Sequence, residues 1–187
     1  MRYRFETRRL LLREARIFDA RAAADYYRRN RSFLEPWEPA HDETFFTPAG
    51  QRWLILADRR GARLAQGLRL WIYLKEDPER GPIGNIAISN IVRGAFQSCF
   101  LGYRLDETHS GKGYMAEAAR RMVEIAFGEL GLHRVEASVM PRNAASIRVL
   151  EHCGFRHEGS SPDYLAIAGA WEEHFHYARI NPAFGRG

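Results

Sequence analysis

The pattern of apolar and polar positions begins with a short strand and then changes to a helix. Residues 8–14, RRLLLRE, place three leucines between charged residues and predict a strand. From Asp19 the sequence DARAAADYYRRN is rich in helix formers, with Asp19 as a suitable N-cap. The segment FLEPWEP follows, and Pro36 and Pro39 predict an extended turn there, because proline cannot continue a helix.

The next pattern is a helix followed by strands. Thr47 before Pro48 has the signature of an N-cap and a first helical residue, so PAGQRWLILADRR predicts a helix to about residue 60. Alternation and aromatic content then increase, with turn residues in EDPERGP. We expect an antiparallel meander of three strands, LRLWIYLK, IGNIAIS and AFQSCFLGYRL.

The second half alternates strands with helices. A helix is predicted from Met115 to Phe127, then the strand HRVEASVM, then a short helix NAASIRVLEHCG that stops at Gly154. The segments DYLAIA and WEEHFHYARI predict a closing hairpin joined at Gly169. The expected fold class is α+β: a mixed, mostly antiparallel sheet flanked by helices, with one parallel strand–helix–strand crossover.

Composition adds limits to this picture. A chain of 187 residues with 45% apolar content favours a single domain over residues 1–187. The charged N-terminal residues lack the apolar core of a signal peptide, and no apolar run approaches the roughly 20 residues that cross a bilayer. We therefore expect a cytoplasmic protein without membrane contact. Cys99 and Cys153 are too few for a disulfide framework and are expected to be buried thiols.

The net charge changes little in the functional picture. The chain has 28 Lys+Arg against 23 Asp+Glu, a formal charge of +5. The arginines are scattered through RRLLLREAR, YYRRNR and DRRGAR, which is typical of solvated helix faces. We expect no direct DNA binding.

The segment ETHSGKGYMAEAA carries the clearest candidate chemistry. Gly111 and Gly113 let the backbone approach a ligand closely, and N–H groups from Ser110 to Tyr114 can point at a pyrophosphate at the N-terminus of the helix. A Walker-type loop does not fit, because no Ser or Thr follows Lys112. A bare glycine-rich turn that merely starts a helix is the remaining structural interpretation.

A dinucleotide fold is a second alternative for the same segment. Gly111, Gly113 and Ala116 satisfy its glycine pattern, and Glu136 follows at a suitable distance. However, only about 50 residues follow the strand that holds Glu136, with no further strand–helix alternation. Glu136 also lies near the start of that strand, whereas the ribose-binding acid belongs at the end.

The segments THSGKGYMAEAA and PRNAASIRVLEHCGF together resemble the GNAT superfamily of acetyl-CoA-dependent N-acetyltransferases. The glycines match the family pattern, but Thr108 stands where the family has Gln or Arg, so Lys112 or a nearby arginine is expected to compensate. The segments YYRRNRSFLEPWEP, ISNIVRGAF and DYLAIAGAW are similar to bacterial ribosomal-protein alanine N-acetyltransferases. That resemblance covers about Phe5 to Pro182.

The resemblance implies acetyl-CoA as the cosubstrate, with no metal. It places the pyrophosphate over residues 110–114 with Met115 beside them, and the pantetheine arm along bulged backbone at Gly102, Tyr103, Arg104 and Leu105. Asn143 opens the following helix and is expected to contact the cofactor arm, serve as an N-cap, or do both. Ser146, one turn on, lies where the family places a hydroxyl near the cofactor sulfur, and a helix-surface serine is the less favoured structural alternative.

The general base has three candidates. Asp163 matches a position where related ribosomal acetyltransferases carry an acid, and Glu136 and His109 are the others. Glu136 has a structural interpretation as a paired strand residue, and His109 as a loop histidine. A free α-amine has a pKa of about 8 and a lysine amine about 10.4, a difference worth roughly 3 kcal/mol. An N-terminal acceptor therefore tolerates a weak or water-relayed base.

The acceptor end is expected at FLEPWEP together with the closing hairpin. Phe33, Trp37 and Tyr164 are candidate walls for a peptide N-terminus, with Trp171 nearby. Glu38, or Glu35, is a candidate for attracting its positive charge. Aromatic residues that simply pack a loop onto the sheet would produce the same pattern.

Three functions remain open from the sequence. The first is acetylation of the N-terminal α-amine of a ribosomal protein, with ribosomal particles as a partner and a monomer or dimer as the working form. The second is acetylation of a small amine such as a polyamine, an aminoglycoside or a metabolite. The third is a ribosome-assembly factor that uses the fold mainly for binding.

Overall fold

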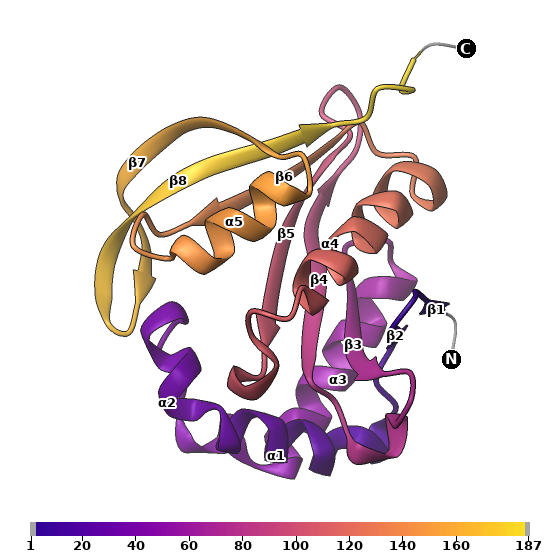
Figure 1. Cartoon of the computed structure of the whole chain (residues 1–187), viewed down its shortest axis with the longest axis vertical. Coiled ribbons are helices and arrows are strands. Elements are labelled where there is room, and N and C mark those ends of the chain that lie inside the picture. The colour runs from indigo at the N-terminus through magenta and orange to yellow at the C-terminus, as the bar shows by residue number, and fades with distance from the viewer. Residues whose placement is uncertain (1–2, 186–187) are drawn as a thin grey trace.

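One twisted sheet organises the chain. The computed structural model describes residues 3–185 (Figure 1). Eight strands pair in the order β1-β2-β3-β4-β5-β6-β8-β7. Their bounds are β1 Arg4–Glu6, β2 Leu10–Arg13, β3 Leu68–Leu74, β4 Gly84–Val92, β5 Ser98–Leu105, β6 Arg134–Val139, β7 Arg156–Ile167 and β8 Ala170–Ile180. Among the strands of residues 3–185 only the β5–β6 pair is parallel, so the predicted mixed sheet with one crossover is confirmed.

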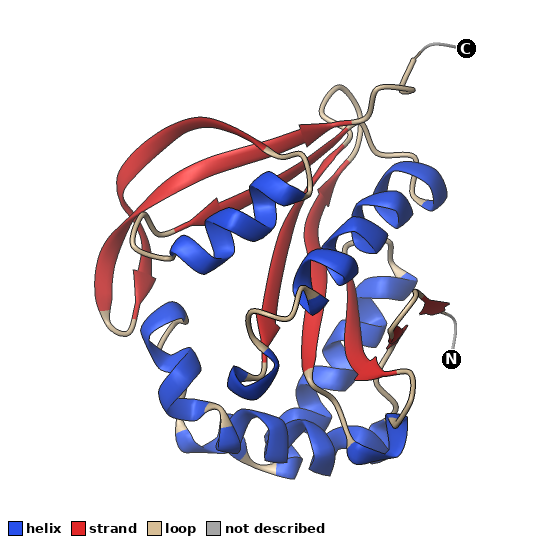
Figure 2. Ribbon diagram, in the orientation of Figure 1, coloured by secondary structure: helices blue, strands red, loops and turns tan. Residues whose placement is uncertain are grey.

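Helices cover the two faces of the sheet unequally (Figure 2). Their bounds are α1 Ala20–Arg29, α2 Arg31–Leu34, α3 Pro48–Arg63, α4 Tyr114–Glu124 and α5 Ala144–His152. The larger apolar core joins α4 and α5 to one face of the sheet. A smaller, aromatic core joins α1 and α3 to the other face, mainly against β2 and β3. The half of the sheet formed by β6, β8 and β7 therefore has a helix, α5, on one face.

The parallel pair separates soon after it begins. Hydrogen-bonded register between β5 and β6 runs from Ser98 opposite Arg134 to Phe100 opposite Glu136 and ends there. Both strands continue beyond that point, β5 to Leu105 and β6 to Val139. The two strands part in the middle of the sheet, beside the N-terminal ends of α4 and α5 (Figure 1).

Most predicted elements are present, and the local corrections have physical causes. Thr47 caps α3 by accepting from the Gly50 N–H, as predicted. Asp19 does not cap α1, because its carboxylate accepts instead from Arg13 and from the Arg16 N–H. The expected extended turn at FLEPWEP is a helical turn, since a proline fits the first positions of a 3₁₀ helix.

Two further differences concern the strands. The short edge strand β1 was not predicted, because three residues carry too little alternation. The expected bulge at Gly102–Leu105 is absent, and that segment pairs in regular register with Gly84–Ala87. The irregularity of this strand pair lies between Ser89 and Val92, where Asn90 has a φ of 50°.

The remaining sequence expectations concern cysteines and membrane spans. Cys99 and Cys153 are both buried and free, as predicted. Burial raises the pKa of Cys99 to about 12, so this thiol stays protonated and unreactive. Among residues 3–185, no helix is both long and apolar enough to span a membrane.

Candidate functional site

The cofactor cradle, residues 110–114, is a left-handed turn leading into α4. Gly111 and Gly113 have φ angles of 74° and 77°, which L side chains rarely adopt. A Cβ at Gly111 would meet nothing within 4 Å, so the turn is open on its outer side. Within residues 3–185 the N–H groups of Gly111, Lys112, Gly113 and Tyr114 have no hydrogen-bond acceptor. Open space with unpaired donors at a helix N-terminus suits a pyrophosphate.

One expected member of the cradle has another role. The Ser110 N–H donates to the Glu107 carbonyl, closing the 3₁₀ turn Glu107–His109, and is not available to a phosphate. The Met115 side chain is buried in the core, so only its backbone lies near the cradle. Lys112 is exposed and free to reach an anion.

Arg9, from the segment before β2, braces the cradle. Its Nε donates to Glu117 at 2.7 Å, and its Nη1 donates to the Lys112 carbonyl at 3.0 Å. Its guanidinium lies 4.4 Å from the centre of the Tyr114 ring. Hydrogen bonds from Thr7 and Arg9 outweigh burial and lower the pKa of Glu117, which stays ionised. The chain therefore supplies an arginine beside the cradle, although Thr108 replaces the family's basic or amide residue.

Asp106 holds the approach to the cradle in place. Its buried carboxylate accepts from Arg29 at 2.8 Å and from Asn30 at 3.1 Å. It also accepts from the Thr108 N–H and hydroxyl, at 3.0 and 2.6 Å. Burial alone would raise the pKa of Asp106, but these hydrogen bonds lower it well below its usual value. Thr108 thus turns inward to Asp106 rather than outward to a phosphate.

Tyr103 and Ser146 meet across the parting of the strands, on the face that carries α4 and α5. The Tyr103 hydroxyl lies 2.8 Å from Ser146 Oγ and donates to the Ser146 carbonyl at 3.2 Å. Burial raises the pKa of Tyr103 well above its usual value, so the phenol is protonated at neutral pH. Asn143 caps α5 by accepting from the Ser146 N–H at 3.0 Å. Tyr103 and Ser146 together can supply a proton at this point.

Arg104 and Leu105 point to opposite faces of β5. Leu105 packs against the larger core. Arg104 lies on the opposite face and forms an ion pair with the buried carboxylate of Glu38, which His41 also contacts at 3.1 Å. Glu38 therefore joins the FLEPWEP segment to β5, and its charge is already balanced by an arginine.

The three candidate bases lie in different places. Glu136 lies on β6 with an ion pair to Arg134 at 3.3 Å. His109 lies in the turn before the cradle, with Nδ1 3.4 Å from Asp106. Asp163 is exposed in a bulge of β7, where its own φ is 48°. The structure does not bring these three side chains together.

The predicted acceptor residues are tied together by a second set of contacts. The hairpin β7–β8 curves toward α2 (Figure 1), and the Ala168 N–H donates to the Glu38 carbonyl at 2.9 Å. Arg142 lies 5.5 Å from the Trp37 ring and pairs with Glu172 of β8 at 3.0 Å. Phe33 packs against the smaller core, and Trp171 is largely exposed.

Tyr164 packs on a pair of histidines that the sequence analysis did not single out. Its ring lies 5.7 Å from His174 and 4.7 Å from His176. The alternation in EEHFHYAR places these histidines on one face of β8, opposite Phe175 and Tyr177. This alternation can be seen in the sequence, whereas the contacts of Arg9 and Arg104 join residues far apart in the sequence and cannot be seen there.

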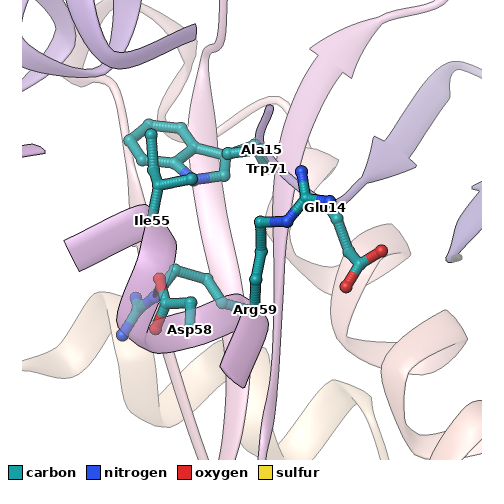
Figure 3. A pocket seen from close by; sticks show the side chains of 7 residues that line it. Glu14, Ala15, Ile55, Asp58, Arg59 and Trp71 are labelled. Atoms are coloured by element: carbon teal, nitrogen blue, oxygen red, sulfur yellow. Dashed lines mark hydrogen bonds and ion pairs between the residues drawn. The ribbon is translucent and has the colours of Figure 1, made fainter. Parts of the chain in front are cut away.

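A small cavity elsewhere does not belong to this site (Figure 3). It lies against β3 and α3 and measures about 10 Å³, room for one water molecule. Its wall includes Trp71, whose Nε1 is buried without a protein partner among the described residues. Across residues 3–185, no cluster of three or more His, Cys, Asp or Glu side chains is arranged to hold a metal ion.

Comparisons with known proteins agree with this geometry. The family model described as acetyltransferase (GNAT) domain matches residues 9–156. The [Ribosomal protein uS5]-alanine N-acetyltransferase of Escherichia coli is 37% identical over 184 residues, covering 98% of this chain and 94% of that protein. The crystal structure of ribosomal-protein-S5-alanine acetyltransferase from Vibrio fischeri superposes with a TM-score of 0.91 at 35% identity, covering 97% and 98% of the two chains.

A third similar protein was solved with a form of the cofactor. Mycobacterium smegmatis RimJ in complex with CoA-disulfide has a TM-score of 0.87 and 31% identity, covering 94% of this chain and 84% of that one. The similarity extends over nearly the whole chain, and the family match includes the cradle, Tyr103 and Ser146. The chain therefore belongs to the GNAT acetyltransferase family, and it is an N-acetyltransferase similar to ribosomal-protein alanine N-acetyltransferases.

Proposed function

We propose that the protein transfers an acetyl group from acetyl-CoA to the N-terminal α-amine of a ribosomal protein that begins with alanine. The observation that carries this proposal is the similarity, over 98% of the chain, to a protein named for that reaction on uS5. Ribosomal particles as a partner belong to the same proposal. In this proposal the four candidate acceptor residues, Phe33, Trp37, Glu38 and Tyr164, border the place where the chain end binds.

The described residues supply what acetyl transfer requires. When bound, acetyl-CoA supplies an activated thioester carbonyl. The cradle residues Gly111–Tyr114 offer N–H groups to its pyrophosphate, and Lys112 adds a positive charge. Asn143 Nδ2 has no partner among residues 3–185 and is free to donate to the pantetheine arm. Ser146, hydrogen-bonded to the neutral phenol of Tyr103, provides the proton that the departing thiolate needs.

The charges near the candidate acceptor residues favour the N-terminus of a peptide over a polyamine as the substrate. The carboxylates of Glu38, Glu136 and Glu172 each pair with an arginine. A polycation such as spermidine binds most tightly to several unpaired carboxylates, because each ammonium needs a partner when it leaves water. A peptide α-amine must lose its single charge before it reacts, so it needs no such cluster.

A competition assay tests the proposal. The purified protein is given acetyl-CoA with a peptide that begins with alanine, or the same peptide with a blocked α-amine and an internal lysine. Spermidine and an aminoglycoside form the other two arms. We expect the free alanine peptide to be acetylated fastest and the blocked peptide hardly at all. Faster turnover of either small amine would replace this proposal with small-amine acetylation.

A further inference from the structure

The acceptor face is the face of β5, β6 and β8 that lies opposite α5. Arg104 identifies it, because its side chain contacts Glu38 and lies on the side of the smaller core. Side chains two residues apart in a strand share a face, and directly paired residues also share one. Phe100 pairs with Glu136, and Ser138 pairs with His176. Ser138, His174 and His176 therefore belong to the acceptor face.

Three adjacent strands contribute a chain of polar groups to this face. His176 Nδ1 on β8 lies 3.3 Å from Ser138 Oγ on β6. His176 Nε2 lies 2.9 Å from Ser161 Oγ on β7. With the proton assigned to Nε2, the ring donates to Ser161 and its Nδ1 accepts from Ser138. The Tyr164 ring packs edge-on against the imidazole and fixes its plane.

This chain of groups begins where the strands part. Ser138 follows Glu136, the last residue of β6 paired with β5, by two positions. Across the parting, Gly102 faces the same side, and a Cβ there would meet nothing within 4 Å. The Ser138 hydroxyl therefore borders the space between the parted strands on the acceptor face. A cofactor bound in that space would leave this hydroxyl within reach of an amine that approaches across the open side at Gly102.

We propose that Ser138 and His176 form a proton relay that removes the proton from the attacking amine, a role that rests on the proposed acetyl transfer. The amine nitrogen forms a bond to the thioester carbon as the carbon–sulfur bond breaks. The amine proton passes to Ser138 Oγ while the Ser138 proton passes to His176 Nδ1. The thiolate takes a proton on the opposite face, from Ser146 and Tyr103, so charge balances across the step.

An ionised carboxylate of β7 lies close enough to interact with His176. Glu158 is ionised, because a hydrogen bond from Arg134 lowers its pKa, and the charge of His176 contributes in the same direction. Arg134 pairs with both Glu136 and Glu158, so its positive charge is balanced by two carboxylates. Tyr164 is the other titratable group that packs against His176, and its ring also contacts His174.

Matched variants of one hairpin test the relay. His157 lies on the same hairpin but packs on Phe175 and Tyr177, the opposite face, so H157A is the control for H176A. Wild-type protein is first assayed on the acceptor panel described above, and its fastest amine is used for every variant. Acetyl-CoA binding is measured by calorimetry, and kcat is measured with and without added imidazole.

We expect H176A to lose on the order of 10²-fold or more in kcat, the range for a positioned general base, with acetyl-CoA affinity unchanged. Added imidazole should raise the kcat of H176A about tenfold. H157A should retain nearly wild-type kcat and show no response to imidazole. The kcat of S138A should fall about as far as that of H176A. S138T keeps the hydroxyl and should keep most of the wild-type kcat.

Other results overturn the relay. A kcat for H176A within about twofold of wild type would remove His176 from the reaction. Equal losses in H176A and H157A without imidazole rescue would make the histidine structural. A preference for a small amine in the wild-type panel contradicts only the proposed acceptor, because the same variants still test the relay on that amine.

Discussion

The cofactor cradle and the acceptor face lie on opposite sides of the parted strands and are built in different ways. The cradle is five consecutive residues whose backbone conformation is set by Gly111 and Gly113. The acceptor face is assembled from side chains of β5, β6, β7 and β8 and from the loop that holds Glu38. A contiguous backbone site tolerates side-chain changes nearby but not a change of φ. An assembled side-chain site has the opposite sensitivity.

The largest effect should come from forcing a side chain onto the cradle. Gly113→Val places a β-branched residue at a φ of 77° and should lower acetyl-CoA affinity by about 100-fold, since the turn must open to relieve the strain. Calorimetry measures this. Gly94→Val is the matched control, with a φ of 70° and open space, in the turn before β5. Equal affinity losses in both variants would show that the cradle has no special role.

The second effect concerns the proton supply on the cofactor side. Ser146→Ala should lower kcat by roughly tenfold or more while acetyl-CoA affinity stays nearly unchanged, because protonation of the thiolate is a transition-state event. Tyr103→Phe should give a similar loss, since its hydroxyl lies 2.8 Å from Ser146 Oγ. A wild-type kcat in both variants across the pH range would make water the proton source.

The third effect should appear only on the acceptor side. Trp37→Ala removes the ring beside Arg142 and should raise the KM for an alanine peptide by about tenfold, the scale of one well-packed aromatic contact. Acetyl-CoA affinity should not change, because the ring contact of Trp37 within residues 3–185 is with Arg142 and not with the cradle. Kinetics with each substrate varied in turn separate the two. A rise in the KM for acetyl-CoA alone would instead assign Trp37 to the cofactor site.

The last effect is on stability rather than on activity, and it concerns the approach to the cradle. Asp106 has a lowered pKa when folded, so its stabilisation is present above the unfolded pKa and is lost as pH falls through that value toward the folded one. Asp106→Asn should therefore destabilise the protein by about 2 kcal/mol at neutral pH, and by less near pH 3. Urea unfolding at both pH values measures this. A difference independent of pH would contradict the ionised assignment.

The same contrast explains what the sequence could predict. Glycines flanking Lys112 at a helix start predict the cradle, since the motif is local. The succession of strands and helices along the chain and the single crossover also follow from local patterns, whereas β1 and the position of β8 between β6 and β7 do not. Arg9 bracing Glu117 cannot be predicted this way, because the partners are 108 positions apart. Ser138, His176 and Ser161 become neighbours only through the register of three strands.

The proposed acceptor, the N-terminus of a ribosomal protein, is tested most directly by the intact masses of the ribosomal proteins. Ribosomal proteins are isolated from source cells with and without the gene for this chain, and from cells complemented with wild type or the Gly113→Val variant. We predict that one alanine-starting ribosomal protein loses a single acetyl group from its N-terminus without the gene. The wild-type gene should restore it, and the variant should not. Unchanged masses of all ribosomal proteins in the deletion strain would contradict the account.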